Sequence, residues 1–178
     1  MVTNPLADLL VRYKAIEFGD FTLASGAKSP YYIDVKTAMT HPDFLSAVAQ
    51  SVASAHSCDV VAGVAVGGVP LCVATALEKN VPFAIIRASE KDHGKKSLII
   101  GDVKGKDVLL VEDVTTSGGS ALYGIETLRA AGARADRVVT VVDREQGAET
   151  MLQKHGIRLL PLVRIRELLK EKTFVSQA

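Results

Sequence analysis

The stretch Val108-Leu-Leu-Val-Glu112-Asp113-Val114-Thr115-Thr116-Ser117-Gly118-Gly119-Ser120-Ala121 decides how this chain folds. An apolar run ends in two adjacent carboxylates, a loop of hydroxyl side chains and glycines follows, and a helical pattern then begins. The N-terminus of a helix presents unpaired N–H groups and a partial positive charge, so it attracts anions. The paired glycines let the backbone curl around a phosphate, and the hydroxyls add donors. The stretch therefore predicts a strand, a phosphate-binding loop and a helix.

The two carboxylates of this stretch, Glu112 and Asp113, are anionic and do not suit a phosphate. They suit the hydroxyls of a sugar or the ligand shell of a magnesium ion. Acids near a helix start also occur as ordinary capping residues, which is the structural alternative. Other nucleotide motifs do not fit, since no GxGxxG follows a strand and residues 101–106 have the wrong spacing for a P-loop.

On both sides of this stretch the chain alternates between apolar strands and helices. Strands are expected over residues 60–66, 82–87, 107–111, 137–142 and 157–163, and helices over 70–79, 120–131 and 148–155. This alternation is typical of an α/β fold with a mainly parallel sheet flanked by helices. Ligands of such sheets bind beyond the carboxyl ends of the strands. We therefore expect the functional residues in the loops after residues 66, 87, 111 and 142.

Smaller elements are expected at the N-terminal side and at the sheet edge. The pattern predicts a helix over residues 5–14, a hairpin over 21–36 around Ser25-Gly26, and a helix over 42–56. Residues 97–103 are expected to pair with a neighbouring strand, and a short helix to follow the last strand. The length of the chain is that of one domain, residues 1–178.

Composition and charge argue against several function classes. With 21 basic and 20 acidic side chains among 178 residues, the chain lacks the basic excess typical of nucleic-acid-binding proteins. The uncharged run 60–77 is long enough for a membrane span, but three glycines and Pro70 interrupt it, so we expect none. Cys58 and Cys72 form no CxxC pair and the N-terminus carries no cationic leader, which favours reduced thiols in a cytoplasmic protein.

The strand–loop–helix stretch resembles the signature of the type I phosphoribosyltransferases, in which a hydrophobic strand and two acids precede TTSGGS. The resemblance implies that Glu112 and Asp113 bind the ribose hydroxyls of 5-phosphoribosyl diphosphate. It also implies that the loop Val114-Thr115-Thr116-Ser117-Gly118-Gly119-Ser120 cradles the 5-phosphate. Magnesium (Mg2+) is the implied cofactor, held through the substrate, with Glu112 and Asp113 as candidate ligands.

A second segment, Phe21-Thr-Leu-Ala-Ser25-Gly26-Ala-Lys28-Ser29-Pro30-Tyr31-Tyr32-Ile-Asp34, resembles the N-terminal hairpin of the orotate phosphoribosyltransferases. In that family the aromatic pair lies at the orotate ring. The resemblance implies that Lys28, Tyr31 and Tyr32 bind orotate, together with Thr116. The alternative is an ordinary hairpin with core tyrosines, because aromatic residues favour strands.

A third segment, Arg87-Ala-Ser-Glu-Lys91-Asp92-His93-Gly94, resembles the R-x-x-x-KDHG loop of that family, which folds over the site of the neighbouring subunit. The resemblance implies that Arg87, Lys91 and His93 neutralise the departing pyrophosphate, and that Lys91 and His93 are catalytic together with Asp113. It further implies a homodimer whose loops are shared between subunits. The alternative is a solvated polar loop.

A fourth segment, Val142-Asp143-Arg144-Glu145, resembles the family's D-R-[QE] motif, whose Arg binds the base. An Arg grips a planar carboxylate with two parallel hydrogen bonds. Orotate carries such a carboxylate, whereas adenine, guanine and uracil do not. The alternative is a surface ion pair between Arg144 and its acidic neighbours.

The residues Ala65, Val66, Gly67 and Gly68 match the family's pyrophosphate loop, and the resemblance makes the Ala65–Val66 bond a candidate for a non-proline cis peptide. The chain also departs from the family. Many members have Lys at the positions of Ala24, Gly67 and Ala88, and this chain has none of the three. Lys28, Lys95 and Lys96 are candidate substitutes.

The resemblance runs from Phe21 to the last strand and implies a type I phosphoribosyltransferase fold, with residues 1–40 and the C-terminal strand and helix forming a base-binding hood. The implied reaction joins orotate to 5-phosphoribosyl diphosphate. One alternative is a purine phosphoribosyltransferase of the same fold, which would lack the hairpin and Arg144. Another is a phosphoribosyltransferase-like regulator that binds nucleic acid, which would usually add a helix-turn-helix or a basic face. His41, His56 and His155 are interpreted as structural.

Overall fold

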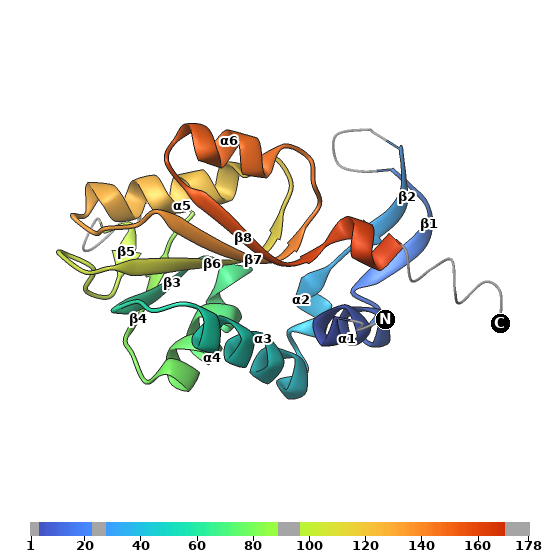
Figure 1. Cartoon of the computed structure of the whole chain (residues 1–178), viewed down its shortest axis with the longest axis horizontal. Helices are drawn as coiled ribbons and strands as arrows, with labels where there is room; N and C mark the ends of the chain where they lie inside the picture. The colour runs from blue at the N-terminus through green and yellow to red at the C-terminus, as the bar shows by residue number, and fades with distance from the viewer. Residues whose placement is uncertain (1–3, 23–27, 89–96, 170–178) are drawn as a thin grey trace.

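The computed structural model describes residues 4–22, 28–88 and 97–169 (Figure 1). Within these residues a six-stranded sheet has the strand order β5-β4-β3-β6-β7-β8. Its strands are β3 (Val60–Val64), β4 (Phe83–Ile86), β5 (Ile99–Ile100), β6 (Val108–Thr115), β7 (Arg137–Asp143) and β8 (Arg158–Arg164). Neighbouring strands are parallel except at the edge, where β5 pairs antiparallel with β4. The predicted mainly parallel sheet is confirmed, and of the segment 97–103 that was expected to pair with a neighbouring strand, residues 99–100 do so.

Helices cover both faces of this sheet (Figure 1). One face carries α3 (Pro42–Ala55) and α4 (Gly68–Lys79), and the other carries α5 (Gly119–Ala130) and α6 (Ala148–Lys154). The apolar positions of β6 serve both layers because successive side chains of a strand point to opposite faces. Leu109 is fully buried in the cluster that includes Leu71 and Cys72 of α4, and Leu110 in the cluster with Ile125 of α5. The uncharged run 60–77 is thus β3 and α4, and none of the described helices is long and apolar enough to cross a membrane.

A smaller N-terminal unit lies at one end of the sheet (Figure 1). It consists of α1 (Pro5–Arg12), the antiparallel pair β1 (Ile16–Thr22) and β2 (Lys28–Ile33), and α2 (Val35–Ala38). The side chain of Asn4 caps α1, as its position before Pro5 predicts, and Asn4 Nδ2 donates to Leu162 O in β8 at 2.8 Å. This hydrogen bond ties the start of the chain to the last strand. A helix over 165–169 follows that strand.

Two predicted boundaries are wrong. The hairpin begins at Ile16 rather than near residue 21, because Ile16 pairs with Ile33 and extends the ladder towards α1. Strand β6 continues to Thr115 rather than ending at 111, because β7 pairs with it as far as Thr115 and Asp143. The two acids of the signature therefore lie inside a strand. The predicted turn Ser25-Gly26 lies outside the described residues.

Candidate active site

The predicted functional loops meet at the carboxyl ends of β3, β4, β6 and β7, since these strands are parallel neighbours. Glu112 and Asp113 point to opposite faces of β6 because they are consecutive in a strand. Glu112 faces α5, where Ser120 Oγ donates to its Oε1 at 2.7 Å. Asp113 faces α2, where Lys36 Nζ donates to its Oδ2 at 2.6 Å. Each acid is therefore held by a different element.

Glu112 is the residue of this site whose ionisation is most altered. Its side chain is buried, and burial raises its pKa to about 7. The hydrogen bond from Ser120 lowers the pKa and the charge of Asp113 raises it, but both effects are smaller than the desolvation. At neutral pH the carboxyl group is consequently divided between its protonated and ionised forms.

The loop before α5 has the geometry of an anion cradle. Gly118 is the N-cap of α5 and has φ 88°, and among the described residues no side chain makes a cap hydrogen bond to the helix. The N–H groups of the first turn are thus left for a ligand. Thr116 and Ser117 are exposed in front of them. Thr115 differs from the prediction in its surroundings, since its hydroxyl is buried and donates to Asp143 Oδ1 at 3.2 Å.

Arg144 follows β7 and turns its guanidinium towards the hairpin. The Cζ atom lies 5.3 Å from the centroid of the Tyr31 ring. Nε and Nη2 are buried, yet they have no hydrogen-bond partner in the part of the chain that the structure describes. Its backbone is fixed, because Arg144 N donates to Thr115 O at 2.9 Å. Buried N–H donors without partners are rare in proteins. The guanidinium of Arg144 can therefore donate two hydrogen bonds to a ligand that carries acceptor oxygens.

The acidic neighbours of Arg144 pair with other residues, which argues against the surface ion-pair interpretation. Arg164 Nη1 in β8 lies 3.5 Å from Asp143 Oδ2, and Arg166 Nη1 lies 3.4 Å from Glu145 Oε1. Asp143 Oδ1 also accepts from Glu145 N at 3.0 Å. These contacts fix the turn that presents Arg144 and leave its guanidinium for another group.

The three hairpin residues that were predicted to bind the base lie on different faces of the hairpin. Tyr31 faces Arg144, whereas Tyr32 is 47% exposed and its ring centroid lies 5.8 Å from that of Phe21. Lys28 begins β2, and its Nζ donates to Thr22 Oγ1 at 2.8 Å. Among these three residues, Tyr31 is the one that the structure brings against Arg144.

The pyrophosphate loop connects β3 to α4. The Ala65–Val66 peptide bond is cis, as predicted. Val66 is exposed, and Gly67 packs directly against Asp113. A Cβ atom at position 67 would lie 2.5 Å from Asp113 Oδ2, so the carboxylate occupies the space that a side chain there would need. A side chain at this position would therefore require the carboxylate of Asp113 to move.

Arg87 follows β4 and begins the segment that is predicted to form the shared loop. Its N–H donates to Leu98 O at 2.8 Å, and its carbonyl accepts from Tyr123 Oη at 2.7 Å. These bonds fix the backbone of Arg87 between the sheet edge and α5. Lys91 and His93 lie outside the described residues, as do Ala24, Lys95 and Lys96.

Lys36 is the site residue that the sequence analysis missed. It lies in α2, two positions after Asp34, whose Oδ1 accepts from Lys36 N at 3.1 Å. Burial lowers the pKa of the ammonium, but the hydrogen bond to Asp113 and the charges of Asp113 and Asp34 outweigh this effect, so its pKa is raised. The signal in the sequence that could have found Lys36 is a basic residue two positions after Asp34, the last residue of the hairpin motif.

The donor set of the site suits magnesium held mainly by a substrate. Glu112 and Asp113 offer carboxylate oxygens, the ligands that Mg2+ prefers. Among the described residues, no three His, Cys, Asp or Glu side chains gather in a group that could hold a metal alone. Mg2+ commonly keeps several waters and takes one or two carboxylates together with substrate phosphates. The residues present fit that mode of binding.

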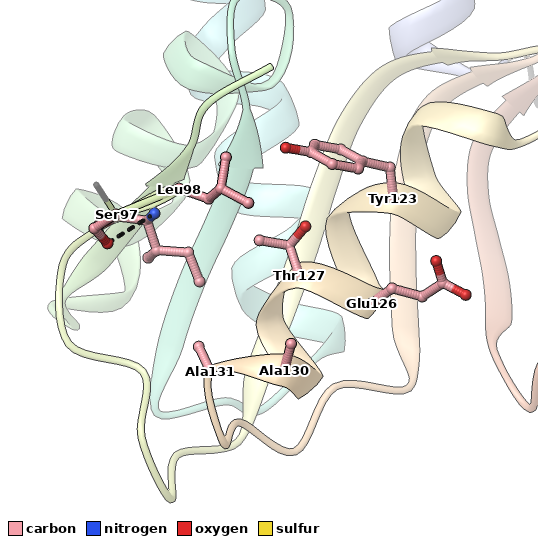
Figure 2. Close-up of a pocket in the computed structure, with 8 residues that line it drawn as sticks. Ser97, Leu98, Tyr123, Glu126, Thr127, Ala130 and Ala131 are labelled. Carbon is pink, nitrogen blue, oxygen red and sulfur yellow. Dashed lines mark hydrogen bonds between the residues drawn. The ribbon is translucent and has the colours of Figure 1, made fainter. Parts of the chain in front are cut away.

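A second hollow, of about 520 Å³, lies between the sheet edge at β5 and α5 (Figure 2). In Figure 2 the side chain of Leu98 faces Tyr123 and Thr127 of α5, whereas the Ser97 hydroxyl turns back to its own segment and accepts from Ile99 N. Of the described residues that line it, Glu126 alone is charged, and it is an acid. The described part of the lining therefore offers no cation to a phosphorylated substrate.

The chain matches the phosphoribosyl transferase domain family over residues 36–157. An orotate phosphoribosyltransferase of Methanocorpusculum labreanum is 62% identical over 168 residues, which span 94% of this chain and 99% of that protein. The orotate phosphoribosyltransferase from Aeropyrum pernix superposes with a TM-score of 0.83 at 30% identity, over 95% of this chain and 98% of the other. The Mycobacterium tuberculosis H37Rv enzyme in complex with 5-phospho-α-D-ribosyl 1-diphosphate gives a TM-score of 0.73 at 26% identity, over 93% and 90%.

The fold and these matches together define a type I phosphoribosyltransferase. Within that class the chain belongs to the orotate phosphoribosyltransferase family, whose members are pentosyltransferase enzymes. The predicted fold class and family are confirmed. The high identity to curated relatives favours this family over the purine-specific and regulatory alternatives.

Proposed function

We propose that the site transfers the 5-phosphoribosyl group from 5-phosphoribosyl diphosphate to orotate, giving orotidine 5′-monophosphate and pyrophosphate. The observation that carries the proposal is Arg144, whose buried Nε and Nη2 have no partner among the described residues and whose guanidinium lies over Tyr31. A planar carboxylate satisfies two such donors at once. Orotate has both the carboxylate and a flat ring that stacks on an aromatic side chain.

The two substrates are assigned to different parts of the site. The N-terminus of α5 and the loop 114–120 hold the 5-phosphate, and Glu112 and Asp113 bind the ribose hydroxyls. Arg144, Tyr31 and the exposed hydroxyl of Thr116 orient the base. The remaining predicted contacts are assigned from the resemblance alone: Lys28 and Tyr32 on orotate, and Arg87, Lys91 and His93 on the diphosphate.

The chemistry needs no covalent nucleophile. A ring nitrogen of orotate attacks the anomeric carbon as pyrophosphate leaves, the configuration inverts, and the transition state resembles an oxocarbenium ion. The residues of the chain hold the two substrates in line, place negative charge beside the ribose, and exclude water. Lys91 and His93 are proposed to stabilise the leaving group together with Arg87. Magnesium, when bound, would be held through the substrate with Glu112 and Asp113 as candidate ligands, and it would supply charge neutralisation for the departing diphosphate.

We also propose that the protein is a homodimer. Seven large hydrophobic side chains are exposed among the described residues, and four of them lie on the pyrophosphate loop, α4, β4 and β5: Val66, Leu77, Phe83 and Ile100. Phe83 and Ile100 face the same side of the sheet as Val61, because Phe83 pairs in register with Val61 and Ile100 with Ile85. These exposed apolar side chains support the proposed interface. It adjoins Arg87, from which the predicted shared loop leaves the sheet.

The remaining partner and location predictions rest on the sequence. A cytoplasmic location agrees with the two free thiols, Cys58 and Cys72. The near-neutral charge supports the expectation of no nucleic-acid partner.

A base panel tests the proposed reaction. The protein is mixed with 5-phosphoribosyl diphosphate, magnesium and one of orotate, adenine, guanine or uracil, and the absorbance of the base is followed. We expect orotate to be consumed, pyrophosphate to appear in equal amount, and chelation of magnesium to stop the reaction. Consumption of a purine instead of orotate would overturn the assignment of Arg144 as the carboxylate receptor.

A further inference from the structure

Lys36 has no role in the reaction as described above, although it contacts the centre of the site. Its Nζ lies 2.6 Å from Asp113 Oδ2. Hydrogen bonds hold both the side chain and the backbone of Lys36. Asp34 fixes the first turn of α2, because its two oxygens accept from Lys36 N and from Thr37 Oγ1, each at 3.1 Å. The side chain of Lys36 is 58% exposed, whereas that of Asp113 is 10% exposed. The ammonium therefore covers the solvent side of the carboxylate, where a ligand would arrive.

The pyrophosphate loop meets Lys36 on the same carboxylate oxygen. A Cβ atom at Gly67 would lie 2.5 Å from Asp113 Oδ2, the atom to which Lys36 donates. The loop residues Ala65, Val66, Gly67 and Gly68 carry no charge. A diphosphate bound along this loop brings several negative charges beside Asp113, which is itself an anion. Like charges at this distance are unfavourable unless a cation lies between them.

We propose that Lys36 is a diphosphate-binding residue that bridges Asp113 and the diphosphate group of the sugar substrate. An ammonium has three N–H donors, and the bond to Asp113 uses one of them. The other two have no hydrogen-bond partner among the described residues, so they can contact diphosphate oxygens and stay with the pyrophosphate product. This inference rests on the proposed function, because it concerns the same substrate.

Lys36 could instead serve only to neutralise Asp113, and the two roles predict different measurements. If the lysine only neutralises Asp113, its loss weakens every step that needs that carboxylate, with no particular effect on pyrophosphate. If it binds the diphosphate, its loss weakens the diphosphate substrate and the pyrophosphate product, while the affinity for orotate is kept.

The test uses the full chain with Lys36→Met, which keeps the length of the side chain, and Lys36→Arg, which keeps the charge. Lys106→Met is the matched control, since Lys106 is exposed beside the opposite, N-terminal end of β6 and its loss changes the net charge equally. Binding of magnesium pyrophosphate is measured by calorimetry, and KM is measured for both substrates. We expect Lys36→Met to raise the Kd of pyrophosphate and the KM of the sugar diphosphate at least about tenfold, as for a lost charge-assisted hydrogen bond. The KM of orotate should stay within about twofold, Lys36→Arg should recover part of the loss, and Lys106→Met should match the wild type.

An unchanged pyrophosphate Kd in Lys36→Met would overturn the inference, and so would an equal loss for both substrates. Lys36→Gln replaces the methionine variant if that variant does not fold, as judged by circular dichroism. A wild-type protein that binds pyrophosphate through Lys36 but does not consume orotate would refute the proposed reaction and leave this inference standing.

Discussion

Burial, rather than a neighbouring charge, sets the ionisation of Glu112. Desolvation raises its pKa to about 7, and the hydrogen bond from Ser120 offsets this only in part. The carboxyl group is therefore favoured in its protonated form below neutral pH. A ribose hydroxyl or a cation that arrives at Glu112 meets a group that changes its charge within the physiological range, and such poised acids are common at functional sites.

The substitution Glu112→Gln should make the ligand-free protein more stable at high pH. The raised pKa means that folding is penalised as pH rises from the ordinary carboxyl value towards 7, that the penalty is complete above 7, and that it vanishes in acid. A glutamine has no such penalty and still accepts from Ser120. We expect a gain of at most about 3 kcal/mol at pH 8, since one pKa unit corresponds to about 1.4 kcal/mol.

Thermal unfolding at pH 5 and pH 8 measures this difference. The gain should be small at pH 5 and large at pH 8. Glu126→Gln, which removes an exposed acid of α5, is the control and should show no such pH dependence. A glutamine variant that is equally stable or less stable at pH 8 would contradict the assignment of burial as the dominant cause.

At Arg144 the geometry predicts a selective loss. Arg144→Ala removes two donors that the structure leaves for a ligand, so we expect the KM of orotate to rise about 10- to 100-fold. The KM of the sugar diphosphate should change little. Arg144→Lys keeps the charge but loses the planar fork, and it should stay nearer to the alanine variant than to the wild type. Initial rates with each substrate varied in turn measure the split, and an equal loss for both would refute the assignment.

The sequence predicted individual residues well where a local motif marked them. Asp113 and Arg144 lie at the carboxyl ends of neighbouring strands, as the alternating pattern implied. Lys36 was missed because its partner is 77 positions away, and no local pattern encodes such a contact. Thr115 was expected at the phosphate, but its hydroxyl bonds to Asp143 because pairing with β7 extends as far as these two residues.

At the scale of elements, the sequence predicted which segments are strands and helices better than where they end. Strand β6 was predicted to stop before the acids, because charged residues usually end an apolar strand. It continues because β7 supplies hydrogen-bond partners on one side through residue 143, a tertiary fact that the local pattern does not contain. The consequence is functional, since strand geometry sends Glu112 to α5 and Asp113 to α2.

Two helices allow a matched test of the phosphate cradle. Gly118 and Gly147 are the N-caps of α5 and α6, with φ 88° and 97°. An alanine at either position is strained by its backbone, at a cost of about 1–2 kcal/mol. A Cβ at Gly118 would also meet Met151 Cε at 2.8 Å, whereas a Cβ at Gly147 meets nothing within 4 Å.

Gly118→Ala and Gly147→Ala should therefore both lower the melting temperature. The loss should be somewhat larger for Gly118→Ala because of the contact with Met151, and only this variant should raise the KM of the sugar diphosphate, because its strained backbone lies in the loop before α5. Differential scanning fluorimetry and initial rates give the two readouts. Equal KM values in the two variants would mean that the loop before α5 does not hold the phosphate.

At the scale of the molecule, the parallel sheet explains why residues far apart in sequence form one site. The strand order places β3, β6 and β7 side by side, so the pyrophosphate loop, the acids and Arg144 end at the same edge. The N-terminal hairpin lies at that end and brings Tyr31 against Arg144. The sequence predicted the sheet from its alternation. It did not predict that α2 contacts the Asp113 face of β6, because that contact depends on how the whole hairpin packs against the sheet.

Complementation between two inactive variants tests whether the molecule works as a dimer with shared sites. Lys91→Ala/His93→Ala removes the loop cations, and Asp113→Asn/Arg144→Ala removes the pocket groups. In a two-fold dimer each loop serves the pocket of its partner, so a hybrid dimer contains one site built from two intact halves. We expect each hybrid dimer to recover up to about half of the native activity, provided that subunits exchange. Activity of the mixed sample is compared with that of each variant alone.

The apolar surface supplies the control for this experiment. Leu77 is 76% exposed on α4, and Leu77→Asp places a charge on the proposed interface. Added to both variants, this change should abolish the recovered activity and shift the mass measured by light scattering towards that of a monomer. The melting temperature of each variant should stay the same. Recovery that persists in Leu77→Asp dimers would place the dimer interface away from Leu77. No recovery despite proven hybrid dimers would mean that each loop serves its own subunit, because the hybrid then contains no site with both its loop and its pocket intact.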